Sequence, residues 1–294
     1  MKTAETQRIL LKFRRHLEKK RKNPNTVRSY TNDVRQFLAW FSCTYGPECD
    51  LRRIERSDIM DFRTYLQTRR ASYASVNRRL TALRQFFDMC VSTGLLETNP
   101  VADIAGVPPV PSIPSILTRK EAQLLVRAVE RLERPLETVI VHLLLHAGLR
   151  GSEICGLTVG DVHLTPRLGR LFIRGRRNRT MRFVMLTTRS VAALRRYLRR
   201  RGILALPRRL RAEPLLVNRE GNPLTQQAVD QIVKRVGREA GIPNATPTIL
   251  RNTYAVRMLL QGEPPNSVKR MLGVTSVRNH LRLVERIRLA QIPY

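Results

Sequence analysis

Two arginines interrupt two stretches of this sequence that are otherwise largely apolar. Residues 143–157 read LLLHAGLRGSEICGL and contain Arg150, and residues 246–260 read TPTILRNTYAVRMLL and contain Arg251. Both stretches have the composition of buried helical segments, in which an apolar residue would be expected at these positions. A guanidinium is planar and permanently charged, and it binds phosphate oxygens through two parallel hydrogen bonds. The two arginines are therefore candidate phosphate ligands.

The net charge points to a polyanionic partner. The chain of 294 residues carries a formal charge of +31, with 54 Lys and Arg against 23 Asp and Glu. A folded protein this basic repels itself, and nucleic acid would relieve that repulsion, with an anionic membrane surface as the second candidate. A preference for arginine codons can account for most of the excess of Arg over Lys, although it does not account for the charge.

Several functional classes find no support in the sequence. The four cysteines (Cys43, Cys49, Cys90 and Cys155) lack the spacing of a metal site and suggest reduced, intracellular thiols. There is no phosphate-binding glycine loop, so we expect neither a metal nor a nucleotide cofactor. The longest apolar run, residues 138–149, is too short to span a bilayer, and the charged N-terminus is unlike a signal peptide. We expect a cytoplasmic protein with no membrane partner.

The pattern of apolar residues predicts two domains. Roughly four helices fill residues 3–105; one is expected to be capped by Asn25-Thr26 and another to run over 74–95 and stop at Gly94. Residues 107–117, VPPVPSIPSIL, predict an extended linker between a domain at 1–106 and a domain at 118–294. In the second domain, residues 170–174 and 181–186 predict a β-hairpin. Helices are expected after Thr118, up to about His146, and at about 188–201, 225–240, 249–261 and 264–272. The expected fold class is mainly α with a small β-hairpin or sheet.

The two arginine stretches resemble the arginine boxes of the tyrosine recombinase (phage integrase) family, in its two-domain form. Residues 25–41, NTVRSYTNDVRQFLAWF, and residues 75–104, SVNRRLTALRQFFDMCVSTGLLETNPVADI, resemble helices of the N-terminal core-binding domain of that family. The resemblance covers nearly the whole chain. It implies a helical core-binding domain followed by a catalytic-fold domain, which together clamp duplex DNA.

The resemblance also implies a chemistry and assigns its positions. In the family a tyrosine attacks a DNA phosphate, two arginines neutralise the non-bridging oxygens, a hairpin lysine protonates the leaving oxygen, and histidines hold and relay protons. Arg150 and Arg251 match the two arginines. The other positions carry Arg176 for the lysine, Thr248 and Val274 for the histidines, and Leu283 for the tyrosine. Arginine keeps the charge but is a poor acid, because its pKa is above about 12. Thr248 is best interpreted as a helix cap, and neither valine nor leucine can take part in proton transfer or attack phosphorus.

Two other residues, His280 and Tyr294, could substitute for the missing groups. His280 follows Val274 by six residues and would need a local rearrangement to act in its place. Tyr294 is a possible displaced nucleophile, and Tyr254 occupies a position that suits a core aromatic residue. The sequence therefore predicts a DNA-binding protein that lacks the groups that make and break bonds and keeps those that hold phosphate.

The predicted phosphate ligands are Arg150, Arg176, Arg251, Arg174, Arg177 and Arg179. Arg182 and the helix faces at Arg195-Arg196 and Arg199–Arg201 extend this basic surface, although some of these arginines can be explained as a solvated helix face. The predicted role is that of an architectural or regulatory partner in DNA recombination, DNA integration or the biology of mobile elements, and not that of an enzyme. The partner is duplex DNA, with a homo-oligomer or a hetero-oligomer with an active paralogue as the assembly.

Two alternatives remain open from the sequence. One is an active site-specific recombinase, integrase or transposase with a displaced tyrosine or one supplied in trans. The other is a binder of RNA or another polyanion, although only 5% of residues are aromatic and no run interleaves aromatic with basic residues. Relatives form tetramers that exchange a C-terminal helix, and the residues after Leu283 could form that helix or fold back on their own domain.

Overall fold

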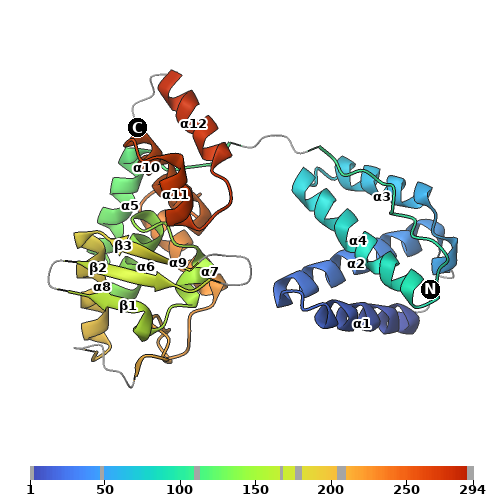
Figure 1. Cartoon of the computed structure of the whole chain (residues 1–294), viewed down its shortest axis with the longest axis horizontal. Coiled ribbons are helices and arrows are strands. Elements are labelled where there is room, and N and C mark those ends of the chain that lie inside the picture. Colours follow the sequence, from blue (N-terminus) through green and yellow to red (C-terminus); the bar gives the residue numbers. More distant parts are fainter. Residues whose placement is uncertain are drawn as a thin grey trace. The chain divides into compact units, whose positions relative to one another are not determined.

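The chain forms two compact units, Met1–Pro111 and Ser112–Tyr294 (Figure 1). The computed structural model describes residues 3–46, 50–108, 113–165, 168–175, 181–203 and 210–289. The division falls inside the proline-rich segment 107–117. The predicted fold class is confirmed, because the described residues form mainly helices with one small antiparallel sheet. None of the described helices is both long enough and apolar enough to cross a membrane.

The N-terminal unit is built from helices around an aromatic core. Its elements are α1 (Thr3–Lys19), α2 (Pro24–Tyr45), the 3-10 helix η1 (Leu51–Arg53), α3 (Arg56–Thr68) and α4 (Tyr73–Ser92). Phe37 is fully buried, and the centre of its ring lies 5.1 Å from that of Phe62 and 6.1 Å from that of Phe87. Helices α2, α3 and α4 are thus held together by side chains that recur at helical spacing in each of them.

The predicted start of α2 is wrong by two residues. Its N-cap is Asn23, whose side chain accepts a hydrogen bond from the backbone N–H of Asn25 at 3.0 Å, and Pro24 is the first helical residue. Proline suits this position because it has no N–H to leave unpaired and its φ is already helical. The pair Asn23-Pro24 therefore begins the helix ahead of Asn25-Thr26. At the other end of the unit, α4 stops before Gly94, whose φ of +69° is left-handed.

The C-terminal unit is organised around a buried helix. Its helices are α5 (Arg119–Arg131), α6 (Pro135–Leu145), α7 (Gly151–Cys155), η2 (Val159–Asp161), α8 (Thr188–Arg200), α9 (Gln226–Glu239), α10 (Pro247–Leu260), α11 (Pro265–Leu272) and α12 (Arg278–Leu289). Every residue of α6 from Glu137 to Leu145 is buried, and α5, α8, α9 and α10 pack around it. A helix that is apolar on all sides needs such a position at the centre of a domain.

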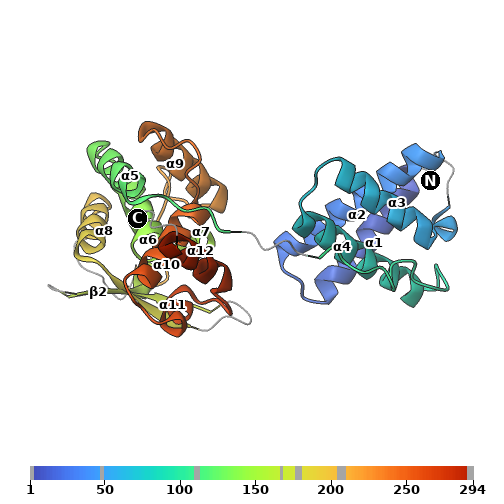
Figure 2. The ribbon, with the colours of Figure 1, turned by 90° about the horizontal axis from the view of Figure 1, so that it is seen from above.

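Three antiparallel strands form the sheet of the C-terminal unit. They are β1 (Val162–Leu164), β2 (Gly169–Ile173) and β3 (Arg182–Leu186), in that order across the sheet. The predicted hairpin is β2–β3, whereas β1 was not predicted because three residues show no measurable alternation. The side chains of Leu171, Val184 and Leu186 are buried on the inner face. Figure 2 shows α5, α6, α8 and α9 on one side of this sheet.

The predicted cap of α10 is also wrong. Thr246 is the N-cap, and its hydroxyl accepts a hydrogen bond from the backbone N–H of Ile249 at 3.2 Å. Thr248 is the second helical residue and is exposed. As in α2, a proline (Pro247) takes the first helical position. Helix α12 folds back on its own unit, where it packs against α10 with Val284 and Ile287 buried.

Candidate phosphate-binding site

The apolar surroundings of Arg150 predicted a position inside a helix, but Arg150 lies in a turn. Helix α6 ends at Leu145, and Arg150 is the residue immediately before α7. The turn between them contains Gly148, whose φ is +62°. A side chain at Gly148 would place its Cβ 2.4 Å from the ring of Tyr254, so only glycine permits this path of the backbone. The turn brings the side chain of Arg150 toward α10 and α11.

Arg150 and Arg251 come together on one backbone carbonyl. Arg251 lies on α10, and its Nη2 donates to the carbonyl oxygen of Leu272 at 2.6 Å. Nη1 of Arg150 donates to the same oxygen at 3.3 Å, and its Nη2 donates to the carbonyl oxygen of Gly273 at 2.9 Å. The two guanidiniums are 101 positions apart in the sequence and adjacent in the fold. This adjacency is the geometry that two ligands of one phosphate require.

A third arginine, Arg182 on β3, joins them. Its Nε donates to the carbonyl oxygen of Met271 at 2.7 Å, and only 8% of its side chain is exposed. Sequence reasoning placed Arg182 in the outer basic hairpin and missed this role. The available signal was alternation along the strand, since Arg182, Val184 and Leu186 share the inward-facing side of β3.

Glu153 is the counter-ion at the centre of the three arginines. Its Oε1 and Oε2 accept from Nη1 and Nη2 of Arg182 at 3.0 and 2.9 Å, a two-point ion pair. Nη1 of Arg150 donates to Oε1 at 2.8 Å, and Nη1 of Arg251 lies 3.6 Å from Oε2. The backbone N–H of Arg150 also donates to Oε2 at 2.9 Å. We call these four residues, Arg150, Arg182, Arg251 and Glu153, the arginine centre.

The arginine centre carries an excess of two positive charges. Burial raises the pKa of Glu153, but the hydrogen bonds from Arg182 and from the Arg150 backbone, with the charges of Arg182 and Arg251, outweigh burial and lower the pKa to about 2. The carboxylate is therefore ionised at neutral pH, and three guanidiniums face one anion. Such a group of fixed cations in a partly buried site stabilises a bound anion such as a phosphodiester.

The C-terminal end of α11 is bound by the arginine centre. The carbonyl groups at the end of a helix have no partner within the helix, and here three of them, at Met271, Leu272 and Gly273, accept from arginines. Gly273 has a left-handed φ of +59°, and a Cβ there would lie 2.7 Å from Nη1 of Arg182. Glycine at position 273 is thus required both by the backbone conformation and by the approach of Arg182.

Two of the positions expected to hold catalytic groups are occupied by packing residues. Leu283 on α12 and Val274 after α11 are half-buried, and both contact the hydrophobic cluster formed by α10, α11 and α12. That cluster includes Tyr254, which is 8% exposed. Burial raises the pKa of Tyr254, whose hydroxyl contacts the sulfur of Met271 at 3.6 Å. Tyr254 therefore acts as a core aromatic residue.

His280 lies beside the arginine centre. Its Nε2 is 3.2 Å from Oδ1 of Asn252, the neighbour of Arg251 on α10. Burial first, and the charge of Arg251 second, lower the pKa of His280. The imidazole is therefore neutral at physiological pH and sits within the electrostatic field of the site. Tyr294 lies outside the described residues.

Of the hairpin arginines predicted as phosphate ligands (Arg174, Arg176, Arg177 and Arg179), Arg174 is the one that the structure describes. Its Nε donates to Oδ1 of Asp161 at 3.0 Å and its Nη2 donates to the hydroxyl of Thr158 at 3.1 Å, so it contacts η2. Arg176, Arg177 and Arg179 lie outside the described residues. On α8, Nη2 of Arg195 donates to the carbonyl oxygen of Thr165 at 2.6 Å, which gives this helix face a structural role as well.

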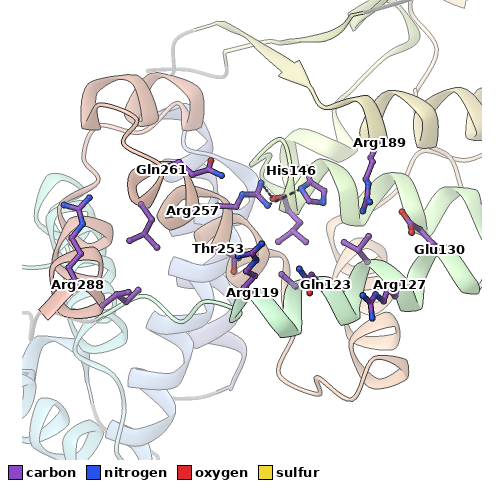
Figure 3. Close-up of a pocket in the computed structure, with 15 residues that line it drawn as sticks. Arg119, Gln123, Arg127, Glu130, His146, Arg189, Thr253, Arg257, Gln261 and Arg288 are labelled. Atoms are coloured by element: carbon purple, nitrogen blue, oxygen red, sulfur yellow. Dashed lines mark hydrogen bonds between the residues drawn. The ribbon is translucent and has the colours of Figure 1, made fainter. Parts of the chain in front are cut away.

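A separate basic pocket of about 1100 Å³ lies between α5, α6, α8, α10 and α12 (Figure 3). It shares no residue with the arginine centre. Its charged lining consists of Arg119, Arg127, Arg189, Arg257, Arg288 and Glu130. At its wall, Nη1 of Arg257 lies 3.3 Å from Nδ1 of His146, and its Nη2 donates to the carbonyl oxygen of Leu145 at 3.1 Å.

His146 is expected to make the C-terminal unit sensitive to acid. Burial, and then the charges of Arg257, His142 and Arg189, lower its pKa to about 3. Since the unfolded chain binds the proton with a pKa near 6.5, stability is highest above about pH 6.5 and falls as pH drops toward 3. We expect His146→Gln to flatten the dependence of unfolding free energy on pH between 7 and 5, measured by urea denaturation. An unchanged slope would contradict a neutral buried His146.

No metal ligand set is present among the residues that the structure describes. Nowhere in these ranges do three His, Cys, Asp or Glu side chains come close enough together to hold an ion. The chemistry that the described site supports is the binding of an anion by guanidiniums.

Comparison with known proteins identifies the family. Residues 115–281 match the phage integrase family, and residues 9–95 match the phage integrase N-terminal SAM-like domain. The chain therefore belongs to the phage integrase family, whose members are also called tyrosine recombinases. It is thus a member of a family of DNA recombination proteins. The resemblance seen in the sequence is confirmed.

Several curated relatives match over most of their length. Tyrosine recombinase XerC of Thermodesulfovibrio yellowstonii is 28% identical over 280 residues, which is 93% of this chain and 90% of the relative. XerC of Roseiflexus sp. is 30% identical over 90% of this chain and 85% of its own. XerD of Listeria monocytogenes is 28% identical over 85% of this chain and 84% of the relative.

Solved structures confirm the fold. XerH bound to a palindromic difH substrate superposes with a TM-score of 0.72 at 20% identity, over 90% of this chain and 79% of that one. A lambda integrase dimer bound to a core site superposes with a TM-score of 0.70 at 16% identity, over 95% of this chain and 94% of the lambda integrase chain.

Proposed function

We propose that this protein binds duplex DNA without cleaving it. Arg150 and Arg251, joined by Arg182, would hold a backbone phosphate, and the basic surface would supply further phosphate contacts with a strong dependence on salt. The observation that carries the proposal is the packing of Leu283 and Val274 into the apolar cluster beside an assembled arginine centre. The proposed site keeps cations for a phosphate and has apolar side chains at the positions that the resemblance assigns to the family's nucleophile and second histidine.

The proposed role is architectural or regulatory, in the cytoplasm. The protein would occupy, bend or complete a recombination site, as a homo-oligomer or together with an active paralogue. Two relatives support a DNA-bound assembly, since XerH was solved on its difH substrate and lambda integrase as a dimer on a core site. Helix α12 packs on its own α10 with Val284 and Ile287 buried, which favours a helix that folds back on its own unit over one that is exchanged with a neighbour.

One alternative function has an observation of its own. An active recombinase whose tyrosine is displaced or comes from a partner chain would still need the arginine centre and a neutral imidazole near it. His280 beside Arg251 meets that second need. A covalent protein–DNA adduct would establish this alternative in place of the DNA-binding function.

Restoring the tyrosine alone is expected to leave cleavage absent. Genomic DNA fragments bound by the wild type would first be selected and sequenced, to provide a duplex substrate. Leu283→Tyr would then be incubated with this duplex carrying a nick near the bound site, and covalent adducts would be sought on a denaturing gel. We expect no adduct, because Val274 and Thr248 still supply no proton donor or acceptor with a pKa near neutrality. Leu283→Phe is the matched control. An adduct formed by the tyrosine variant and not by the phenylalanine variant would overturn this account.

A further inference from the structure

The outer face of the three-stranded sheet is apolar and basic, and the described helices leave it uncovered. Because side chains alternate along a strand, β2 and β3 direct one set of residues away from α6 and α8. This outer face consists of His163, Arg170, Phe172, Phe183 and Met185. Phe183 is 53% exposed and Met185 is 56% exposed. Large apolar side chains grouped in this way mark a binding surface more often than a random part of the surface.

Aromatic rings from two strands meet at the centre of the outer face. Phe172 and Phe183 are direct cross-strand partners, and their ring centres lie 5.2 Å apart. The guanidinium carbon of Arg170 lies 4.9 Å from the centre of the Phe183 ring, within the range of a cation–π contact. The ring of His163 on β1 lies 6.3 Å from that of Phe183. Strand register thus places two phenyl rings, a guanidinium plane and an imidazole side by side.

The charge of the outer face is of one sign. Strands β1, β2 and β3 contain no aspartate or glutamate. Arg170 is exposed on the face, and Arg211 lies with His163 and Arg170 around a hollow at its β1 edge. A ligand for this surface needs flat apolar groups for the rings and negative charge for the arginines.

We propose that the outer face binds single-stranded DNA by stacking unpaired bases on Phe172 and Phe183. The sugar-phosphate backbone would pass along Arg170 and Arg211. This proposal rests on the proposed DNA-binding function and adds a second DNA form at a second surface. Aromatic residues on an antiparallel sheet that stack two or three bases are a known solution for single-stranded nucleic acids.

Two features favour a single strand over a duplex and over a second copy of this chain. In a duplex the flat faces of the bases are covered by their neighbours, so only an unpaired strand can offer them to phenyl rings. A second copy of this chain, docked through the same face, would bring two surfaces of the same positive sign together, with no carboxylate from any strand between them. The cations therefore favour a polyanion and oppose self-association.

The test compares two strands that differ only in their bases. The probes are a fluorescent 12-nucleotide oligo(dT) and an abasic strand with the same number of phosphates. The proteins are the wild type, Phe172→Ala/Phe183→Ala, and Met185→Ala as a control that removes apolar area from the same face without removing a ring. Stacking contributes a factor of about 5 to 150 in affinity per base. We expect the wild type to prefer oligo(dT) by at least about tenfold.

The double variant should bind the two probes equally, while Met185→Ala keeps most of the preference. Phe183 is exposed and Phe172 is half-buried, and circular dichroism would verify that the variant is folded. Equal binding of both probes by the wild type, or an equal loss in Met185→Ala, would overturn the proposal. Wild-type self-association that the double variant abolishes, without any preference for oligo(dT), would make the face an interface between copies and would also overturn it.

Binding of a 30-base-pair duplex separates this proposal from the proposed function. The double variant should bind the duplex within about twofold of the wild type, because the arginine centre is unchanged. A wild type that binds the duplex but does not distinguish the two probes would leave the proposed function standing and remove the stacking surface. A wild type that prefers oligo(dT) but does not bind the duplex would leave the stacking surface standing and remove the proposed function.

Discussion

Replacing Glu153 with alanine is expected to lower the free energy of unfolding of the C-terminal unit by about 3–5 kcal/mol. The substitution removes the carboxylate that Arg150, Arg182 and Arg251 share, and leaves three poorly exposed guanidiniums to repel one another. Breaking a buried ion pair from one side costs more than the pair contributes, because the remaining charge is left without a partner. Glu153→Gln should lie between the wild type and the alanine variant, since an amide oxygen can still accept one arginine.

The single tryptophan supplies an internal control for this measurement. Trp40 packs in the N-terminal unit, whereas Glu153 and its partners all lie in the C-terminal unit. In urea, the circular dichroism transition of Glu153→Ala should therefore shift while the fluorescence transition of Trp40 stays in place. Glu239→Ala, at an exposed position of α9, is the matched surface substitution and should change stability by less than about 0.5 kcal/mol. A cost for Glu153→Ala no greater than that of Glu239→Ala would contradict the arginine centre as described.

Replacing Arg251 with glutamine is expected to weaken duplex DNA binding by about 10- to 100-fold. Hydrogen bonds to a charged phosphate are worth about 1.5–3 kcal/mol each, and glutamine loses both the charge and the fork. The slope of log affinity against log salt concentration should become shallower by about 0.9 for each phosphate contact that is lost. Arg150→Lys keeps the charge and removes the fork, so it should lose affinity with little change in slope.

The exposed arginines provide the comparison. Arg199 lies on the exposed side of α8 near its C-terminal end, and Arg199→Ala removes one charge from the surface without touching the arginine centre. Affinities and salt slopes would be measured by fluorescence anisotropy on the same duplex at several salt concentrations. Equal losses for Arg251→Gln and Arg199→Ala would show that the basic surface binds DNA without a specific phosphate site.

The helices and the hairpin could be predicted from the sequence because their signals are local. Apolar spacing located α2, α4 and most helices of the C-terminal unit, although not α7 or α12, and Thr118 caps α5 as predicted. Both errors in helix starts have the same cause. In each case the residue before a proline is the N-cap (Asn23 and Thr246), and the proline is the first helical residue, where its missing N–H costs nothing. This preference outweighs capping by Asn25-Thr26 and Thr248.

The arginine centre could be predicted only in part. The apolar stretches singled out Arg150 and Arg251, but no local pattern links Glu153 to Arg182, which is 29 residues away and on another element. The role of α11 was equally hidden, because it depends on backbone carbonyl groups at Met271 and Leu272 that carry no side-chain signature.

The outer face of the sheet was missed for a related reason. No run of the sequence interleaves aromatic with basic residues, and this had argued against a stacking surface. Phe172 and Phe183 become neighbours through the register of two strands. Arg170 is directly opposite Met185 and contacts Phe183 as a diagonal neighbour across the two strands. A search along the chain cannot detect a pattern that exists only across strands.

The absence of a covalent bond between protein and DNA is tested most directly by challenging protein–DNA complexes with SDS. The wild type would be bound to its selected duplex fragments, denatured with SDS, and examined for protein that remains attached to DNA. We expect all of the DNA to be released, because the position that the resemblance assigns to the nucleophile holds Leu283. A fraction that resists SDS and is removed by protease would show that another residue or a partner chain attacks the phosphate, and that the protein is a recombinase in its own right.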